Sequence, residues 1–218
     1  MKAFVITLRG HEYSERKAAR CIQTAREIGG VAVERFDGVR PEISEQVMAA
    51  HGLEWTWARK EFEHGLKQRP YGRRAPKIGC AMSHYLLWLR CVHEREPFLI
   101  LEHDAVFERR FDEFGFRYIC QINDPEGATP RGRWWSDKMK ARGPGVFDKS
   151  QVFPGDVPDG LAGNSAYCIK PEAAFAAVKK VLEIGLWPND AMLCRQFFDL
   201  QELYPFVTHV EQEVSTSS

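Results

Sequence analysis

The stretch PFLILEHDAVF, residues 97 to 107, decides how the chain is expected to fold. Phe98 to Leu101 form a short apolar run that is typical of a buried strand. Three polar residues, Glu102, His103 and Asp104, follow this run at once. Such a triplet is either the solvated end of a strand or a site for a metal ion and a phosphate group. The rest of the sequence has to decide between these two interpretations.

Strands and helices are predicted to alternate along the N-terminal half of the chain. The run AFVITL at residues 3–8 is apolar and β-branched, which indicates a buried strand, and VAVERF at 31–36 alternates as a second strand does. A helix capped by Ser14 is expected between them and should end at the glycines 29–30. Strand, helix and strand in this order predict an α/β fold with a parallel sheet.

A further helix is expected to begin at Pro41 and to end at Gly52, with an inward face made of Ile43, Val47 and Ala50. Two irregular insertions are expected at residues 53–77 and 123–160. The remaining predicted elements are a buried helix at 79–92, strands at 98–101, 118–122, 166–169 and 206–210, and helices at 171–182 and 190–198.

Composition limits the class of protein. The chain has 218 residues, 44% of them hydrophobic and 28% charged, which predicts one soluble domain with a core. The formal net charge is zero, which argues against a dedicated nucleic-acid binder. Locally, residues 59–77 carry seven Lys/Arg against two Glu, and residues 131–142 carry five against one Asp. Such runs are either solvated faces or a rim that attracts an anionic ligand.

The cysteines and the chain ends indicate a reducing, cytoplasmic location. Six cysteines occur without any C-x-x-C pair, so buried free thiols are expected rather than disulfides or a zinc knuckle. The N-terminal sequence MKAFVITLRG is too short in its apolar part for a signal peptide, and no stretch approaches the roughly 18 apolar residues of a membrane helix. The sequence contains no indication of the oligomeric state.

The polar triplet itself suggests a cation. If the backbone stays extended, Glu102 and Asp104 point to one side and His103 to the other. Two converging carboxylates repel each other unless a cation lies between them. Mg²⁺ or Mn²⁺ accepts oxygen ligands and often shares its site with substrate phosphates. In an open α/β sheet, ligands bind beyond the carboxyl ends of the strands, where this triplet is expected.

Several blocks of the sequence resemble glycosyltransferase family 25, the lipopolysaccharide-type galactosyl- and glucosyltransferases related to the collagen galactosyltransferases. The block KIGCAMSH at residues 77–84, followed by LILEHDA at 99–105, is similar to the family's G-C-A-x-S-H and L-I-L-E-D-D-A motifs. Weaker matches in the right order are VITLRG at 5–10, FDGV at 36–39, GNSAYCI at 163–169 and WPND at 187–190. Two departures are His103, where the family usually has Asp, and Thr7, where it usually has Asn.

The resemblance implies a GT-A-like single domain over residues 1–218, with a mostly parallel sheet flanked by helices. It implies a metal-dependent, inverting transfer of galactose or glucose from a UDP-sugar to a saccharide acceptor such as a lipopolysaccharide. Asp104 would be a metal ligand, Glu102 a ligand or a donor-ribose contact, and His103 a third ligand for Mn²⁺ or Mg²⁺. Leu8 and Arg9 would flank the nucleotide, with Asp37 near its base or ribose; Arg9 can equally be an ordinary surface charge.

An inverting transfer needs a base that deprotonates the acceptor hydroxyl. Asp190 is the leading candidate for this base, and His84 is the second. Asp190 can instead be a metal or sugar ligand or a helix cap, and His84 a donor-sugar contact or a core residue. Further predicted donor or acceptor contacts are Ser83, Asn164, Ser165 and Tyr167, the last of which can also be core; Trp134 and Trp135 either stack on an acceptor sugar or pack under an insertion.

Two other classes of function remain open at this point. One is a catalytically impaired nucleotide-sugar- or carbohydrate-binding protein on the same fold, with His103 as the lesion. The other is a metal phosphohydrolase, because His103 and Asp104 form an H-D pair; such enzymes build their sites from separated His and Asp residues on helices, whereas this pair follows a predicted strand.

Overall fold

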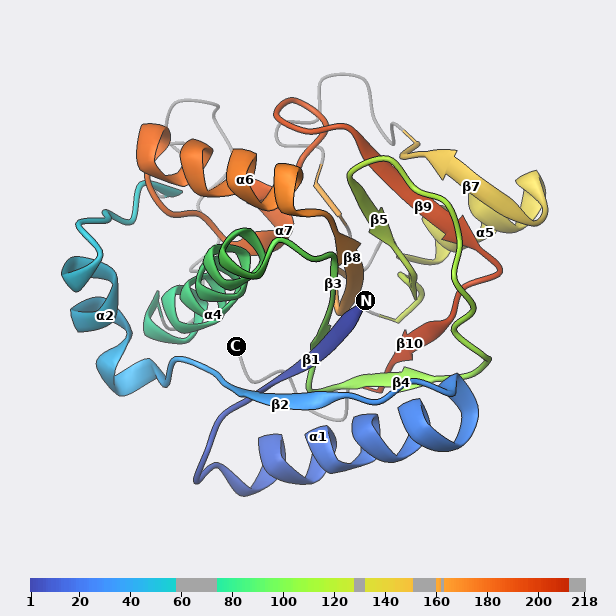
Figure 1. Ribbon diagram of the computed structural model, residues 1–218, viewed down its shortest axis with the longest axis horizontal. Coiled ribbons are helices and arrows are strands. Elements are labelled where there is room, and N and C mark those ends of the chain that lie inside the picture. Colours follow the sequence, from blue (N-terminus) through green and yellow to red (C-terminus); the bar gives the residue numbers. More distant parts are fainter. Residues whose placement is uncertain (58–73, 128–131, 151–159, 162, 212–218) are drawn as a thin grey trace.

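A mixed seven-stranded sheet forms the centre of the protein, with helices on both of its faces (Figure 1). The computed structural model describes residues 1–57, 74–127, 132–150, 160–161 and 163–211. The strand order is β2-β1-β3-β8-β5-β9-β7. These strands span Glu34–Asp37 (β2), Lys2–Thr7 (β1), Phe98–Glu102 (β3), Ala166–Ile169 (β8), Ile119–Gln121 (β5), Leu200–Tyr204 (β9) and Gly145–Asp148 (β7).

Strand direction divides the sheet. β1 pairs in parallel with both β2 and β3, and β5 pairs in parallel with β9. β8 lies antiparallel between β3 and β5, and β7 is antiparallel to β9. The prediction of an α/β fold is therefore confirmed, and the sheet is mixed, with β8 and β7 running against the other strands. A second, small sheet has the order β4-β10-β6, with β4 at Ala105–Phe107, β10 at Thr208–Val210 and β6 at Asn123–Asp124.

Two apolar clusters, one on each face of the central sheet, form the core. Helix α1 (Glu12–Thr24) and the π-helical turn η1 (Ala25–Gly29) cover one face, while α4 (Arg74–Glu94) and α6 (Pro171–Ile184) pack together on the other. Alternate strand residues join alternate clusters. Ala3, Val5, Leu99 and Leu101 face the α1 side, whereas Phe4, Ile6, Phe98 and Ile100 face α4 and α6.

Local sequence explains where α1 begins and ends. His11 caps this helix, because its Nδ1 accepts a hydrogen bond from the Ser14 amide at 3.3 Å. The predicted cap, Ser14, is a buried residue of the first turn instead, and its Oγ accepts from the Leu8 amide at 2.9 Å. The predicted end is confirmed: Gly30 adopts the left-handed conformation with φ 68°, which favours glycine.

The helix predicted from Pro41 has a different inward face. A short 3-10 turn, η2 (Pro41–Ile43), precedes α2 (Ser44–Ala50), and the change of helical repeat rotates the residues that follow. Ser44 and Met48 are buried, whereas the predicted core positions Ile43 and Ala50 are exposed. The prediction was therefore wrong at these two positions.

The two predicted insertions contain more regular structure than expected. In the first, α4 already starts at Arg74, and residues 58–73 lie outside the described part of the chain. The second holds β6, helix α5 (Gly132–Arg142) and β7, whereas residues 128–131 and 151–159 lie outside the description. Both predictions of irregular structure were too broad, because glycine, proline and charge dominate these segments while short elements sit between them.

The C-terminal prediction also needs correction. The helix expected at 190–198 is only α7 (Asn189–Met192), and the strand β9 that follows it was not predicted. The strand is hard to recognise in the sequence because the polar residues Gln201 and Glu202 interrupt the apolar run that a buried strand usually has. Both are buried and used: Gln201 Oε1 accepts from the Arg117 amide, and Glu202 Oε2 accepts from the Ser150 amide.

The close approach of α4 to the end of β2 gives a test of the fold. A Cβ added at Gly79 would lie 2.5 Å from the carbonyl oxygen of Val39, a backbone atom that cannot swing away. Gly79→Ala should therefore destabilise the protein by about 1–3 kcal/mol, although alanine favours an exposed helix by about 1 kcal/mol. Urea unfolding midpoints measure this, with Gly115→Ala as the control, since nothing lies within 4 Å of that position. Equal midpoints for Gly79→Ala and wild type would contradict the close packing.

Candidate active site

The carboxyl ends of β1, β2 and β3 meet at one edge of the sheet, where the predicted site residues gather. Ile6 pairs with Glu102 and Thr7 with Asp37, so these strand ends are level. Arg9, just beyond β1, forms an ion pair with Asp37 at 2.8 Å, and both side chains are exposed. Leu8, Arg9, Asp37 and Glu102, predicted to contact the donor, therefore lie along this edge.

The polar triplet does not continue β3. Residues 103 and 104 form a turn that takes the chain from β3 in the large sheet to β4 in the small one. The condition of an extended backbone, under which Glu102 and Asp104 would point to one side, is not met, because the chain changes sheets at this point. His103 stacks edge-on against Tyr13 at 6.0 Å between ring centroids, and burial lowers its pKa despite the nearby charge of Glu102.

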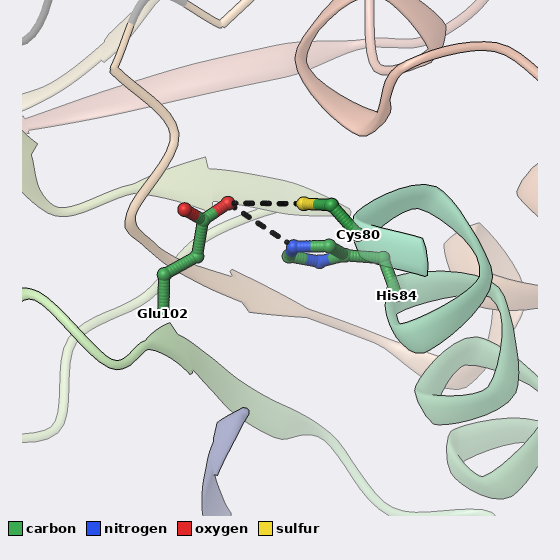
Figure 2. Close-up of side chains that lie close together, drawn as sticks. All are labelled: Cys80, His84 and Glu102. Atoms are coloured by element: carbon green, nitrogen blue, oxygen red, sulfur yellow. Dashed lines mark hydrogen bonds and ion pairs between the residues drawn. The ribbon is translucent and has the colours of Figure 1, made fainter. Parts of the chain in front are cut away.

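Helix α4 supplies the direct partners of Glu102. Cys80 and His84 are four residues apart, so they lie one turn apart on the same side of the helix. The Glu102 Oε1 atom is 3.3 Å from His84 Nε2 and 3.8 Å from the Cys80 thiol (Figure 2). The thiol is also 3.5 Å from Asn189 Oδ1. The motif G-C-A-M-S-H thus brings a thiol and an imidazole to the end of β3.

A buried hydrogen-bonded chain lies behind His84. Its Nδ1 is 2.8 Å from the Tyr167 hydroxyl, and this hydroxyl accepts from the Trp88 indole N–H at 2.9 Å. His84 and Tyr167 stack with ring centroids 5.7 Å apart, and all three side chains are buried. Tyr167 is therefore part of the core, with its hydroxyl aimed at His84.

Ser83 and Ser165 hold backbone segments at the site. Ser83 Oγ accepts from the Val39 amide at 2.8 Å and donates to the Gly79 carbonyl at 2.7 Å, which joins α4 to the turn after β2. The Ser165 carbonyl accepts from the Glu102 amide at 2.7 Å. Both serines are buried, so their predicted contacts with a substrate stay predictions.

Asn164 is buried, and its side-chain amide makes no hydrogen bond to another described residue. Only 4% of this residue is exposed, and within the described ranges neither its Oδ1 nor its Nδ2 has a hydrogen-bond partner. A buried polar group left without a partner costs about 1–3 kcal/mol. Because its neighbour Ser165 is bonded to the Glu102 backbone, this amide lies in the segment just before β8, beside the site.

The electrostatics of the site centre on three carboxylates. Glu102, Asp190 and Asp104 all act on Cys80, and burial followed by these negative charges raises the pKa of its thiol well above the ordinary value. Burial alone would raise the pKa of Glu102, but the hydrogen bond that its carboxylate accepts from His84 brings it below its ordinary value. Partial loss of hydration, and then the charge of Glu102, raise the pKa of Asp190, although this side chain reaches solvent.

Among the residues that the structure describes, one group has its metal-ligand atoms within 4.8 Å of one another: Cys80, His84 and Glu102. Sulfur, nitrogen and oxygen ligands together are typical of a Zn²⁺ site. Of the three predicted metal ligands, Glu102 belongs to this group, whereas His103 and Asp104 do not. Sequence reasoning missed Cys80 and Asn189; the four-residue spacing of Cys80 and His84 before a strand ending in Glu102 was the available signal for Cys80.

A pocket of about 620 Å³ lies next to the segment that carries Asp190. Segment 52–56 and the C-terminal end of α6 form its walls, with Trp187 and Phe197 beside them. Thr56 Oγ1 donates to the Ile184 carbonyl at 2.6 Å, which joins the two walls, and accepts from the Trp187 indole N–H at 2.9 Å. The predicted stacking residues Trp134 and Trp135 lie elsewhere, on α5, where the Lys138 ammonium covers the exposed Trp134 ring at 4.5 Å.

The raised pKa of Asp190 gives a prediction for stability. A carboxyl whose pKa is higher in the folded protein than in the unfolded chain destabilises the fold wherever it is ionised. Asp190→Asn should therefore raise the urea midpoint at pH 7, and this gain should vanish as the pH falls through the ordinary aspartate pKa near about 4.

Asp199→Asn is the control with the opposite sign. The hydrogen bond from Arg117 lowers the pKa of Asp199, so its carboxylate stabilises the fold above the ordinary pKa. This substitution should lower the midpoint at pH 7, with the deficit vanishing as the pH falls through the lowered pKa. A lower midpoint for Asp190→Asn at pH 7 would mean that a partner stabilises the ionised carboxylate.

Comparison with known proteins identifies the family. No curated protein matches the chain. The family model described as glycosyltransferase family 25 (LPS biosynthesis protein) matches residues 1–141, which include β1, β2, α4, β3 and the Glu102 site. Among the described residues, no helix combines the length and hydrophobicity that crossing a membrane requires. The chain therefore belongs to glycosyltransferase family 25 and is a glycosyltransferase.

Proposed function

We propose that this glycosyltransferase is metal-dependent and inverting, and that it moves galactose or glucose from a UDP-sugar to a saccharide acceptor such as a lipopolysaccharide. Family membership supports sugar transfer in lipopolysaccharide biosynthesis. The observation that carries the proposal is that Glu102 ends β3 level with the ends of β1 and β2, with Asp104 in the turn that follows. The charges of Glu102, Asp190 and Asp104 also act together on the thiol of Cys80, on the neighbouring helix α4.

The chemistry of these side chains fits a hard divalent cation. Carboxylate oxygens are the ligands that Mn²⁺ and Mg²⁺ prefer. A cation would relieve the repulsion from Glu102 that adds to burial in raising the pKa of Asp190. We assign Asp104 and Glu102 as the ligands, with His103 as a third candidate. When bound, the metal would neutralise negative charge on the UDP leaving group.

The donor is proposed to lie along the edge formed by β1, β2 and β3. Arg9 and Asp37 form an exposed ion pair there, with Leu8 beside it, and these residues would flank the base and ribose. Asn164 has a buried amide without a partner in the described part of the chain, which suits it to a sugar hydroxyl. Ser83, Ser165 and Tyr167 are buried and internally bonded, so we assign them to the support of this edge.

Asp190 is proposed as the base that takes the proton from the acceptor hydroxyl. Asp190 is exposed to solvent. Burial of its carboxyl, and then the negative charge of Glu102, raise its pKa, which makes the carboxylate a stronger base. The pocket lined by Trp187, three residues before Asp190 in the chain, would receive the acceptor sugar. The carboxylate would hold the hydroxyl on the face of the donor sugar opposite UDP, which an inverting transfer requires.

Release of UDP tests the proposal without a known acceptor. UDP-galactose and UDP-glucose would be incubated with wild type, with and without Mn²⁺ or Mg²⁺, and free UDP measured. Metal-dependent release from one donor is expected, and Asp104→Ala should reduce it by at least about 100-fold, because even groups that only support ligands are worth 10–100-fold. Asp112→Ala is the matched control, since this exposed carboxylate pairs with Arg110 away from the site.

Binding calorimetry with the same donors separates the remaining outcomes. Binding without release, even with saccharides added, would favour the catalytically impaired binding protein. Failure of every UDP-sugar to bind or to react would overturn the UDP-donor assignment.

A further inference from the structure

In the hydrogen-bonded chain behind Glu102, the chemistry of the groups decides which member of each pair donates the hydrogen. The hydrogen-bonded chain runs from Trp88 Nε1 to the Tyr167 hydroxyl at 2.9 Å, then to His84 Nδ1 at 2.8 Å, and from His84 Nε2 to Glu102 Oε1 at 3.3 Å. An indole N–H only donates, so the Tyr167 oxygen must accept from Trp88. The Tyr167 hydroxyl can then donate its own hydrogen only to a different acceptor.

His84 Nδ1 is the acceptor that the geometry offers. Tyr167 is completely buried, and burial raises the pKa of its hydroxyl well above the ordinary value, so it keeps its proton. If Nδ1 carried a hydrogen, Trp88 and His84 would both donate to the Tyr167 oxygen, and the buried hydroxyl proton would be left unbonded. Unmade hydrogen bonds of buried groups are costly, which favours the arrangement in which Tyr167 donates to Nδ1.

We propose that Trp88 and Tyr167 fix His84 as the neutral Nε2–H tautomer, so that His84 is a positioning residue that donates to Glu102 Oε1 and presents Oε2 of that carboxylate to the donor site. This inference rests on the proposed function and reassigns His84, which sequence reasoning considered as a base. With its hydrogen on Nε2, the ring has no free lone pair facing Glu102 and the donor site. Figure 2 shows Oε1 facing His84 and Cys80, with Oε2 turned away from both.

These donor and acceptor roles argue against a metal ion held by Cys80, His84 and Glu102. A metal on His84 would take the Nε2 lone pair and move the ring hydrogen to Nδ1, which would leave the Tyr167 hydroxyl proton without its acceptor. The close approach of these three ligand-type groups is then a hydrogen-bonded arrangement: His84 donates to Glu102 Oε1, and the Cys80 thiol lies 3.8 Å from that oxygen and 3.5 Å from Asn189 Oδ1.

Nitrogen-15 NMR of the histidine side chains tests the tautomer in the full chain without any substrate. The His84 signals are assigned by their loss in His84→Gln. The expected result is a hydrogen on Nε2 and an unprotonated Nδ1 whose shift is that of a hydrogen-bonded acceptor. In Tyr167→Phe, the Nδ1 shift should move to that of a free acceptor. A hydrogen on Nδ1 in wild type, or an Nδ1 shift unchanged in Tyr167→Phe, would overturn the inference whether or not UDP-sugars are substrates.

A pair of amide variants tests the consequence for Glu102. Glutamine places its N–H₂ near the position of Nε2, whereas asparagine places it near Nδ1, so only His84→Gln can still donate to Glu102. His84→Asn should lower kcat for UDP release by about 10- to 100-fold with a smaller change in KM, and His84→Gln should recover most of that loss. His93→Gln, at the exposed end of α4, is the control.

Thermal unfolding of each variant identifies those that simply fail to fold. Equal losses in folded His84→Asn and His84→Gln would contradict the positioning role. If the NMR result holds but wild type neither binds nor hydrolyses any UDP-sugar, the proposed donor fails while the tautomer assignment stands.

Discussion

The parallel pairing of β1 with both β2 and β3 is the constraint on which the functional edge depends. Parallel neighbours bring their carboxyl ends to the same side of a sheet, so Asp37, the residues after Thr7, and Glu102 meet although they are far apart in the chain. Apolar residues on both faces of β3 hold this strand in the centre, with Leu99 and Leu101 on one side and Phe98 and Ile100 on the other. The backbone of Glu102 is therefore placed by the packing of the core.

Burial around this edge has electrostatic consequences. Glu102 keeps a low pKa because His84 donates to it, whereas Asp190, next to the same charge, has a raised pKa. Two carboxyls with opposite shifts in one site suit a division into a permanently charged group and a proton acceptor. Asn164 adds a buried amide that no hydrogen bond among the described residues uses. Such costs are tolerated at binding sites, where a ligand can offset them.

Much of the fold could be predicted from the sequence. The apolar runs of β1 and β3, the long buried helix α4 and the glycine at position 30 appear as expected, because each is encoded by local periodicity or by a backbone conformation that favours glycine. The misses have physical causes too. β9 carries Gln201 and Glu202 in its centre, and their burial is possible only because backbone amides from distant segments bond to them. No local pattern reveals such partners.

The sequence by itself determined the α/β alternation, the arrival of Glu102 at a strand end, and the motif blocks that mark the family. Only the tertiary structure decided what the Glu102 carboxylate meets, because its partners come from α4 and from Asn189, which is 109 residues away from Cys80. It also decided that the chain turns at His103 and Asp104 and that β8 inserts antiparallel beside β3. Hydrophobic periodicity records which side of an element is buried, whereas side-chain pairing depends on how distant elements pack.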